Sequence, residues 1–98
     1  MKPLSIRTIA DAVGGRILRK GKASEITGVS TDTRSIQPGD LFIPLVGERY
    51  DGHDFLEQAV QKGAVAILTQ NLNKTLPEGV HTILTEDTLT ALQDLAAW

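Results

Sequence analysis

The run Ala64-Val65-Ala66-Ile67-Leu68-Thr69 is almost unbroken apolar sequence with the length and composition of a fully buried strand. A second run, VHTILT at residues 80–85, follows after a polar stretch that contains a proline. Strands that are apolar on both sides belong to a sheet that is covered on both faces. The two runs are therefore expected to be central strands of a layered domain.

Further strand-like segments lie earlier in the chain. Residues 16–19 and 25–30 are rich in β-branched and apolar residues, with a turn signal between them. Residues 41–46 also read as a strand, and Pro44 within it suggests an edge position or a bulge. The Pro38-Gly39 pair just before that strand predicts a type II turn.

Helices are expected at both ends of the chain. Ser5 is a candidate N-cap, followed by apolar residues at helical spacing, and Gly14-Gly15 supplies the left-handed stop. Asp87 caps a last helix, with one predicted apolar face formed by Leu89, Leu92, Leu95 and Ala96.

A middle helix is expected from Asp54 as N-cap, with Glu57 at the N3 position of a capping box and Gly63 at its end. Strands followed by short helices and then buried strands predict a small three-layer α/β domain. It should have a mixed, partly parallel sheet, right-handed crossovers and about three helices.

Composition excludes several classes of protein. The chain has 98 residues and a formal net charge of −2, which suits one domain and offers no basic footprint for nucleic acid. With no cysteine and two widely spaced histidines, disulfides, thiol nucleophiles and a metal site are not expected. No apolar stretch approaches the roughly 20 residues of a membrane span, and no signal peptide is visible. A cytoplasmic domain without membrane contact is the expectation.

The first polar loop, Ser30-Thr31-Asp32-Thr33-Arg34, combines hydroxyls, a carboxylate and a guanidinium at a predicted strand end. Hydroxyls suit the polar edge of a pyrimidine or a ribose, and arginine suits a carboxylate or phosphate. The alternative is purely structural: Ser30 and Asp32 close a turn, and Arg34 pairs with a nearby aspartate.

The second polar loop spans residues 47–54, GERYDGHD, and its glycines would let the backbone approach a ligand. Arg49 suits a phosphate and Tyr50 suits stacking on a base, although Tyr50 could equally anchor the following helix. His53 beside Asp54 has the form of an oriented general base, but no serine or cysteine nucleophile accompanies them. His81 lies in a strand run and reads as a structural residue.

Neither a Gly-x-x-x-x-Gly-Lys-[Ser/Thr] loop nor a Gly-x-Gly-x-x-Gly string occurs, so nothing in the chain predicts binding of ATP or a dinucleotide. Catalysis by these residues alone is not expected.

Five strings in a fixed order carry a family resemblance: GVSTDTR (28–34), PGDLF (38–42), GERYDGHDF (47–55), DTL (87–89) and LAAW (95–98). Over essentially all of residues 1–98 the chain resembles the N-terminal substrate-binding domain of the Mur ligase family. It is most similar to the member that adds D-alanyl-D-alanine. The member that adds the third peptide residue is the alternative, because it shares the Asp-Ser/Thr-Arg and Pro-Gly-Asp-Leu-Phe pieces.

The resemblance implies binding of the UDP-MurNAc-peptide substrate through its uridine diphosphate. The implied contacts are Thr31, Asp32, Thr33, Arg34, Gly47, Glu48, Arg49 and Tyr50. It also implies a parent ligase that uses ATP and Mg²⁺, with a central domain that binds ATP and a C-terminal domain that receives the incoming amino acid or dipeptide. Residues 1–98 lack both domains, so the resemblance implies no cofactor in this domain and no activity of the domain alone.

Pro44 and Val46 depart from the family pattern, which often has alanine and lysine there, so a diphosphate contact is in question. A reading from another class remains open: a non-catalytic protein-interaction module that retains the fold.

Overall fold

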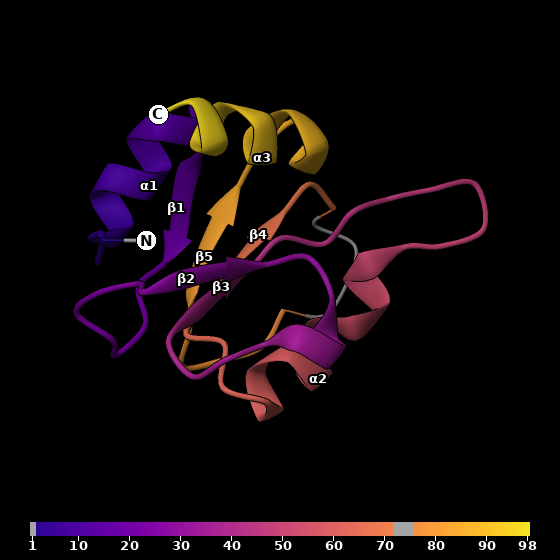
Figure 1. Ribbon diagram of the computed structural model, residues 1–98, viewed down its shortest axis with the longest axis horizontal. Coiled ribbons are helices and arrows are strands. Elements are labelled where there is room, and N and C mark those ends of the chain that lie inside the picture. Colours follow the sequence, from indigo (N-terminus) through magenta and orange to yellow (C-terminus); the bar gives the residue numbers. More distant parts are fainter. Residues whose placement is uncertain (1, 72–75) are drawn as a thin grey trace.

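A computed structural model describes residues 2–71 and 76–98 of the chain, and Figure 1 shows its ribbon. The centre is one five-stranded sheet in the order β1-β5-β4-β3-β2. Its strands are β1 (Arg16–Arg19), β2 (Gly28–Ser30), β3 (Asp40–Phe42), β4 (Ala66–Thr69) and β5 (His81–Leu84). β1 runs antiparallel to β5, and the other neighbours are parallel. The mixed, mostly parallel sheet with β4 and β5 inside it is confirmed.

Helices cover both faces of this sheet. α1 (Ile6–Val13) and α3 (Thr88–Ala97) lie together on one side, and α2 (Leu56–Gln61) lies on the other (Figure 1). Two short 3₁₀ helices, η1 (Thr33–Ser35) and η2 (Gly52–Phe55), sit in the loops after β2 and β3. The result is the predicted three-layer α/β arrangement.

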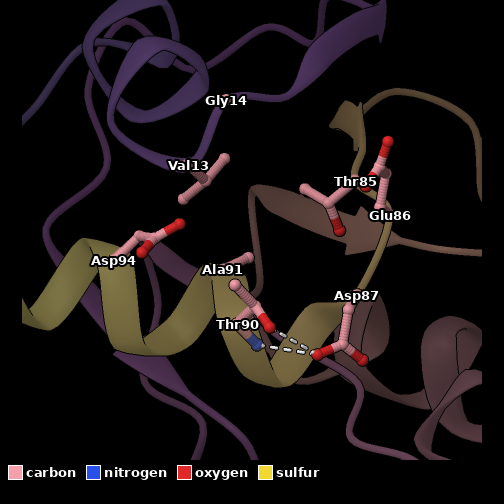
Figure 2. A pocket seen from close by; sticks show the side chains of 8 residues that line it. All are labelled: Val13, Gly14, Thr85, Glu86, Asp87, Thr90, Ala91 and Asp94. Atoms are coloured by element: carbon pink, nitrogen blue, oxygen red, sulfur yellow. Dashed lines mark hydrogen bonds between the residues drawn. The ribbon is translucent and has the colours of Figure 1, made fainter.

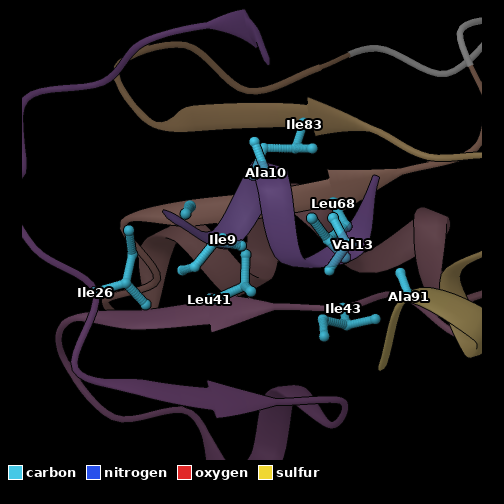
Figure 3. Close-up of a cluster of buried hydrophobic side chains, with 10 residues drawn as sticks. Ile9, Ala10, Val13, Ile26, Leu41, Ile43, Leu68, Ile83 and Ala91 are labelled. Carbon is cyan, nitrogen blue, oxygen red and sulfur yellow. The ribbon is translucent and has the colours of Figure 1, made fainter. Parts of the chain in front are cut away.

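Alternate residues of the central strands face the two helical layers. Leu41 of β3 and Ile43, which directly follows the strand, pack into the cluster beneath α1 and α3. Phe42, which lies between them, packs into the cluster beneath α2. Figure 3 shows the first cluster, with Ile9 of α1 and Ala91 of α3 closing over the strands. Because both faces are buried, these strands need the continuous apolar runs from which they were predicted.

Local signals placed the helix ends and one turn correctly. The Ser5 side chain accepts a hydrogen bond from the Thr8 N–H at 3.2 Å, and Gly14 ends α1 with a φ of 62°. Asp87 caps α3 by accepting from the Thr90 N–H at 3.0 Å. Gly39 has a φ of 93°, as the third residue of a type II turn requires.

Two strand predictions need correction. The strand predicted over residues 25–30 is limited to β2, Gly28–Ser30, which forms the edge of the sheet opposite to β1. The edge position predicted from Pro44 is wrong, because β3 lies between β4 and β2 and ends at Phe42. Pro44 is buried just beyond the strand, where its missing N–H interrupts no ladder.

Two helix predictions also need correction. Asp54 does not cap the middle helix: Asp51 caps η2 by accepting from the His53 N–H, and α2 then begins at Leu56 without a side-chain cap. The buried face of α3 agrees with the predicted face only in part: Thr88 and Ala91 are buried, and Leu92 and Leu95 of the predicted face are partly buried against the core. Leu89 is 50% exposed, and Ala96 is also exposed.

Candidate functional site

The two polar loops meet at one edge of the sheet because β2 and β3 are parallel and both loops leave carboxyl ends. The Ile43 N–H donates to the Ser30 carbonyl at 2.9 Å, which joins the two segments where the loops begin. A hollow of about 410 Å³ opens there, lined by Thr31, Asp32, Thr33, Arg34, Tyr50 and Phe55. Five of these six residues are among those predicted from the sequence.

The backbone of the first loop is held by its own side chains. The Ser30 hydroxyl donates to the Asp32 carbonyl at 2.8 Å, and the Asp32 carboxylate caps η1 by accepting from the Arg34 N–H at 2.8 Å. The Arg34 guanidinium also donates to that carboxylate, with Nη2 2.7 Å from Oδ2. The structural interpretation of Ser30, Asp32 and Arg34 is therefore realised, and it fixes the loop's shape.

The Asp32 carboxylate is strongly stabilised in its charged form. Hydrogen bonds from the Arg34 side chain and backbone lower the pKa of Asp32 from 3.8 to about 2. The same contact raises the pKa of Arg34. Lys62 contributes a smaller attraction to Asp32 and so adds positive charge near the hollow. Both groups of this pair are thus charged throughout the physiological pH range.

Thr31 and Thr33 differ from their neighbours in the first loop. Within residues 2–71 and 76–98, neither hydroxyl has a hydrogen-bond partner, although both side chains line the hollow. Thr33 is 8% exposed and Thr31 is half-buried. Two hydroxyls that can each donate and accept are therefore available to a bound molecule.

The second loop projects from the edge of the sheet as a tight turn (Figure 1). Val46 and Asp51 form an antiparallel bridge at its base, and the Gly47 N–H donates to the Tyr50 carbonyl at 2.6 Å. Gly47, Glu48 and Arg49 are exposed at the tip and do not line the hollow. Arg49 forms no ion pair with the described residues, so its guanidinium is available to an anion.

One wall of the hollow is aromatic. Tyr50 stacks on Phe55, with ring centroids 5.6 Å apart. The sequence analysis did not predict Phe55 as a site residue. The signal that could have found it is its place in the second polar loop's own string, five residues after Tyr50. Two stacked rings offer a flat apolar surface beside the free hydroxyls.

His53 is not part of a catalytic dyad with Asp54. Its side chain is fully buried, its Nδ1 lies 2.7 Å from Asp51 Oδ1, and its Nε2 accepts from the Gln70 N–H at 3.1 Å. Both ring nitrogens are thus occupied, and neither is available to remove a proton from a ligand. His81 is likewise satisfied, between the Gly21 N–H and the Ala23 carbonyl.

A second hollow, of about 250 Å³, lies between the end of α1 and the start of α3 (Figure 2). It contains the Asp87 carboxylate, which accepts from both the N–H and the hydroxyl of Thr90. In the part of the chain that the structure describes, no group of three or more histidine, aspartate or glutamate residues could hold a metal ion. No described helix has the length and apolarity needed to cross a membrane.

The chain is a domain of the α/β class, with a hollow at the carboxyl ends of parallel strands that is lined by threonines, Arg34 and an aromatic pair. The family model "Mur ligase family, catalytic domain" matches residues 25–97, and the chain belongs to the Mur ligase family.

The chain is similar to UDP-N-acetylmuramoyl-tripeptide--D-alanyl-D-alanine ligases. It is 45% identical to the Bacillus subtilis enzyme over 94% of this chain and 20% of that protein. It is 37% identical to the Escherichia coli enzyme over 100% of this chain and 21% of that protein. A crystal structure of MurF from Acinetobacter baumannii matches 99% of this chain and 21% of its own, with a TM-score of 0.85 and 28% identity. The chain spans about a fifth of these relatives' length.

Proposed function

We propose that residues 1–98 form a substrate-binding domain that holds a UDP-MurNAc-peptide by its uridine diphosphate. The parent enzyme would be an ATP-dependent ligase that adds D-alanyl-D-alanine during synthesis of peptidoglycan precursors in the cytoplasm. The observation that carries the proposal is the hollow itself: it is lined by Thr31 and Thr33, whose hydroxyls have no partner among the described residues, and by the stacked rings of Tyr50 and Phe55.

Each part of a uridine diphosphate has a matching group in this arrangement. The uracil and ribose offer donors and acceptors that suit the Thr31 and Thr33 hydroxyls, and the flat base suits stacking on the aromatic wall. The diphosphate suits the guanidinium of Arg49, supported by the positive charge of Arg34. In this proposal Asp32 shapes the loop, and Gly47 and Glu48 contact the ligand through the backbone at the loop's tip.

Chemistry is proposed to occur elsewhere in the parent protein. The chain has no Gly-x-x-x-x-Gly-Lys-[Ser/Thr] phosphate loop, so ATP and Mg²⁺ would be bound by central and C-terminal domains. The MurF ligase of Thermotoga maritima, 15% of which matches this chain with a TM-score of 0.59, was solved in complex with ADP. The role of residues 1–98 is to anchor and orient the substrate, and the domain alone would not turn it over.

Calorimetric titration with a ligand series tests this assignment. UDP and UDP-MurNAc-tripeptide should bind with similar affinity, because the nucleotide supplies the contacts, and the free tripeptide and ATP should give no heat of binding. Binding of the peptide without the nucleotide, or of ATP in preference to UDP, would contradict the proposal. If none of the four ligands gives a heat of binding, the result would favour a protein-interaction role for the exposed loops.

A further inference from the structure

A chain of hydrogen bonds joins the second loop to the start of α3. Asp51 Oδ1 lies 2.7 Å from His53 Nδ1, and His53 Nε2 accepts from the Gln70 N–H at 3.1 Å. The Gln70 side chain continues the chain, since its Oε1 accepts from the Thr88 N–H at 2.7 Å and from the Thr88 hydroxyl at 3.0 Å. The network thus runs from the base of the loop, across the carboxyl end of β4, to the first residue of α3.

The hydrogen-bond geometry also indicates which tautomer the ring adopts. Because the Gln70 backbone can only donate, His53 Nε2 must carry a lone pair, and the ring proton sits on Nδ1 and is donated to Asp51. The same Asp51 oxygen accepts from the His53 N–H at 2.9 Å. A fully buried ring that is hydrogen-bonded at both nitrogens has one orientation. The ring therefore holds Asp51 in a fixed position relative to Gln70.

The position of His53 in the sequence makes this tether relevant to the hollow. Tyr50 directly precedes Asp51, and Phe55 lies two residues after His53, so the two stacked rings flank the tethered segment. Fixing Asp51 and His53 to the end of β4 therefore fixes the aromatic wall. Across the hollow, the first loop is held independently by Ser30 and Asp32. The distance between the two sides of the hollow depends on the tether.

We propose that His53 is a positioning residue for the nucleotide site: through Asp51 and Gln70 it sets the aromatic wall at the spacing that a base requires. This rests on the proposed function, in which Tyr50 and Phe55 stack on uracil. His53 does not touch the ligand itself. Its effect is to keep the binding-competent arrangement populated, and affinity falls in proportion to the fraction of molecules that leave that arrangement.

His81 provides a matched control within the same chain. It is also a buried imidazole with both nitrogens bonded, accepting from the Gly21 N–H at 2.9 Å and facing the Ala23 carbonyl at 2.6 Å. It begins β5, at the opposite end of the strands from the two loops. Substituting His81 should cost folding stability by the same mechanism as substituting His53, but it leaves the hollow intact.

The experiment compares His53→Leu, which removes both ring contacts, with His53→Gln, which restores an acceptor toward the Gln70 N–H. His81→Leu and His81→Gln are the controls. Affinity for UDP is measured by calorimetry, and the Tyr50 to Phe55 ring contact is followed by nuclear Overhauser effects. We expect His53→Leu to weaken UDP binding about tenfold, His53→Gln to recover part of the loss, and both His81 variants to bind within about twofold of the parent.

The two measurements separate this proposal from the proposed function. If the unsubstituted chain does not bind UDP, the nucleotide assignment fails, and the ring contact still tests the tether. Loss of that contact in His53→Leu, its partial recovery in His53→Gln and its retention in both His81 variants support positioning. If the contact and UDP affinity survive in His53→Gln and His53→Leu, or fall equally in the His81 variants, the proposal is overturned. Should His53→Leu not fold, the two Gln variants decide the matter.

Discussion

The ring of Tyr50 stacks on the ring of Phe55, with centroids 5.6 Å apart and planes 18° from parallel. Tyr50 is 47% exposed, so the outer face of this pair is available to a third ring. An aromatic pair of this kind, fixed at the rim of a polar hollow, is the feature that most favours a nucleobase over a purely phosphate-bearing ligand.

Removing the outer ring should weaken nucleotide binding. Stacking of a base on an aromatic side chain is worth about 1–3 kcal/mol, so Tyr50→Ala should raise the Kd for UDP about tenfold or more, and Tyr50→Phe should keep most of the affinity. Calorimetry on both variants measures this. Leu89→Ala is the control, because Leu89 is similarly exposed but lies on α3 and does not line the hollow. If Tyr50→Ala and the parent chain bind UDP with equal affinity, stacking on Tyr50 does not contribute to binding.

The interaction between Asp32 and Arg34 should be detectable in the titration of Asp32 at low pH. Hydrogen bonds from Arg34 lower the pKa of Asp32 from 3.8 to about 2. Since the folded-state pKa is depressed, the pair's contribution to stability is present above pH 3.8 and is lost as the pH falls through about 2. Carboxyl carbon shifts followed by NMR should titrate near that lower value.

In Arg34→Gln the titration of Asp32 should move back toward its ordinary range but not reach it, because the backbone N–H of residue 34 still caps the carboxylate. A parent chain in which Asp32 titrates at its ordinary value would show that the ion pair does not persist in solution.

The two glycines of the second loop should respond differently to alanine. A Cβ on Gly52 would lie 2.8 Å from both the Leu45 nitrogen and the Pro44 Cα, so overpacking should cost about 1–3 kcal/mol in the free energy of unfolding. A Cβ on Gly47 would meet nothing closer than the Tyr50 carbonyl oxygen at 3.8 Å, so the Gly47→Ala chain should be about as stable as the parent. Urea unfolding of both variants checks this. Equal stability would mean that the loop does not pack against Leu45 as described.

A lysine at the base of the loop should strengthen nucleotide binding. Val46 is 52% exposed and stands where the family often has lysine, so Val46→Lys adds a positive charge beside the loop without disturbing the core. UDP affinity should rise in low salt, and the gain should shrink as salt is added, because exposed charges are screened. Uridine without phosphates is the control ligand and should show no gain. A gain that is the same for uridine and UDP would exclude a diphosphate contact.

Local features of the fold could be predicted from the sequence because they are encoded within a few residues. The caps at Ser5 and Asp87 and the turn at Gly39 each depend on side chains and dihedral angles that neighbouring residues determine. The central strands were predictable for a similar reason, since burial on both faces demands an unbroken apolar run.

Long-range features could not be predicted in the same way. His53 and Asp54 are adjacent in sequence and suggest a dyad, but the partner of Nε2 is the Gln70 N–H, 17 residues away. The separation of β1 and β2 to opposite edges of the sheet likewise depends on which strands pair. The sequence predicted Asp54 as the cap of the middle helix, but the short helix η2 precedes α2 and is capped by Asp51.

The residues that line the hollow were predicted from the sequence in the first loop and only partly in the second. Thr31 to Arg34 all line the hollow, but in the second loop only Tyr50 does, because the turn carries Gly47, Glu48 and Arg49 out to its tip. Phe55 enters the wall through its stacking on Tyr50, a contact that follows from the conformation of η2 rather than from spacing.

An NMR titration of the isotope-labelled chain with UDP tests the central claim most directly. The account predicts that amide shifts concentrate at residues 31–34 and 47–50, and that the double variant Thr31→Val with Thr33→Val loses most of the response without unfolding. Shifts centred elsewhere, for example at the hollow between α1 and α3, or no shifts up to about 1 mM UDP, would contradict the account.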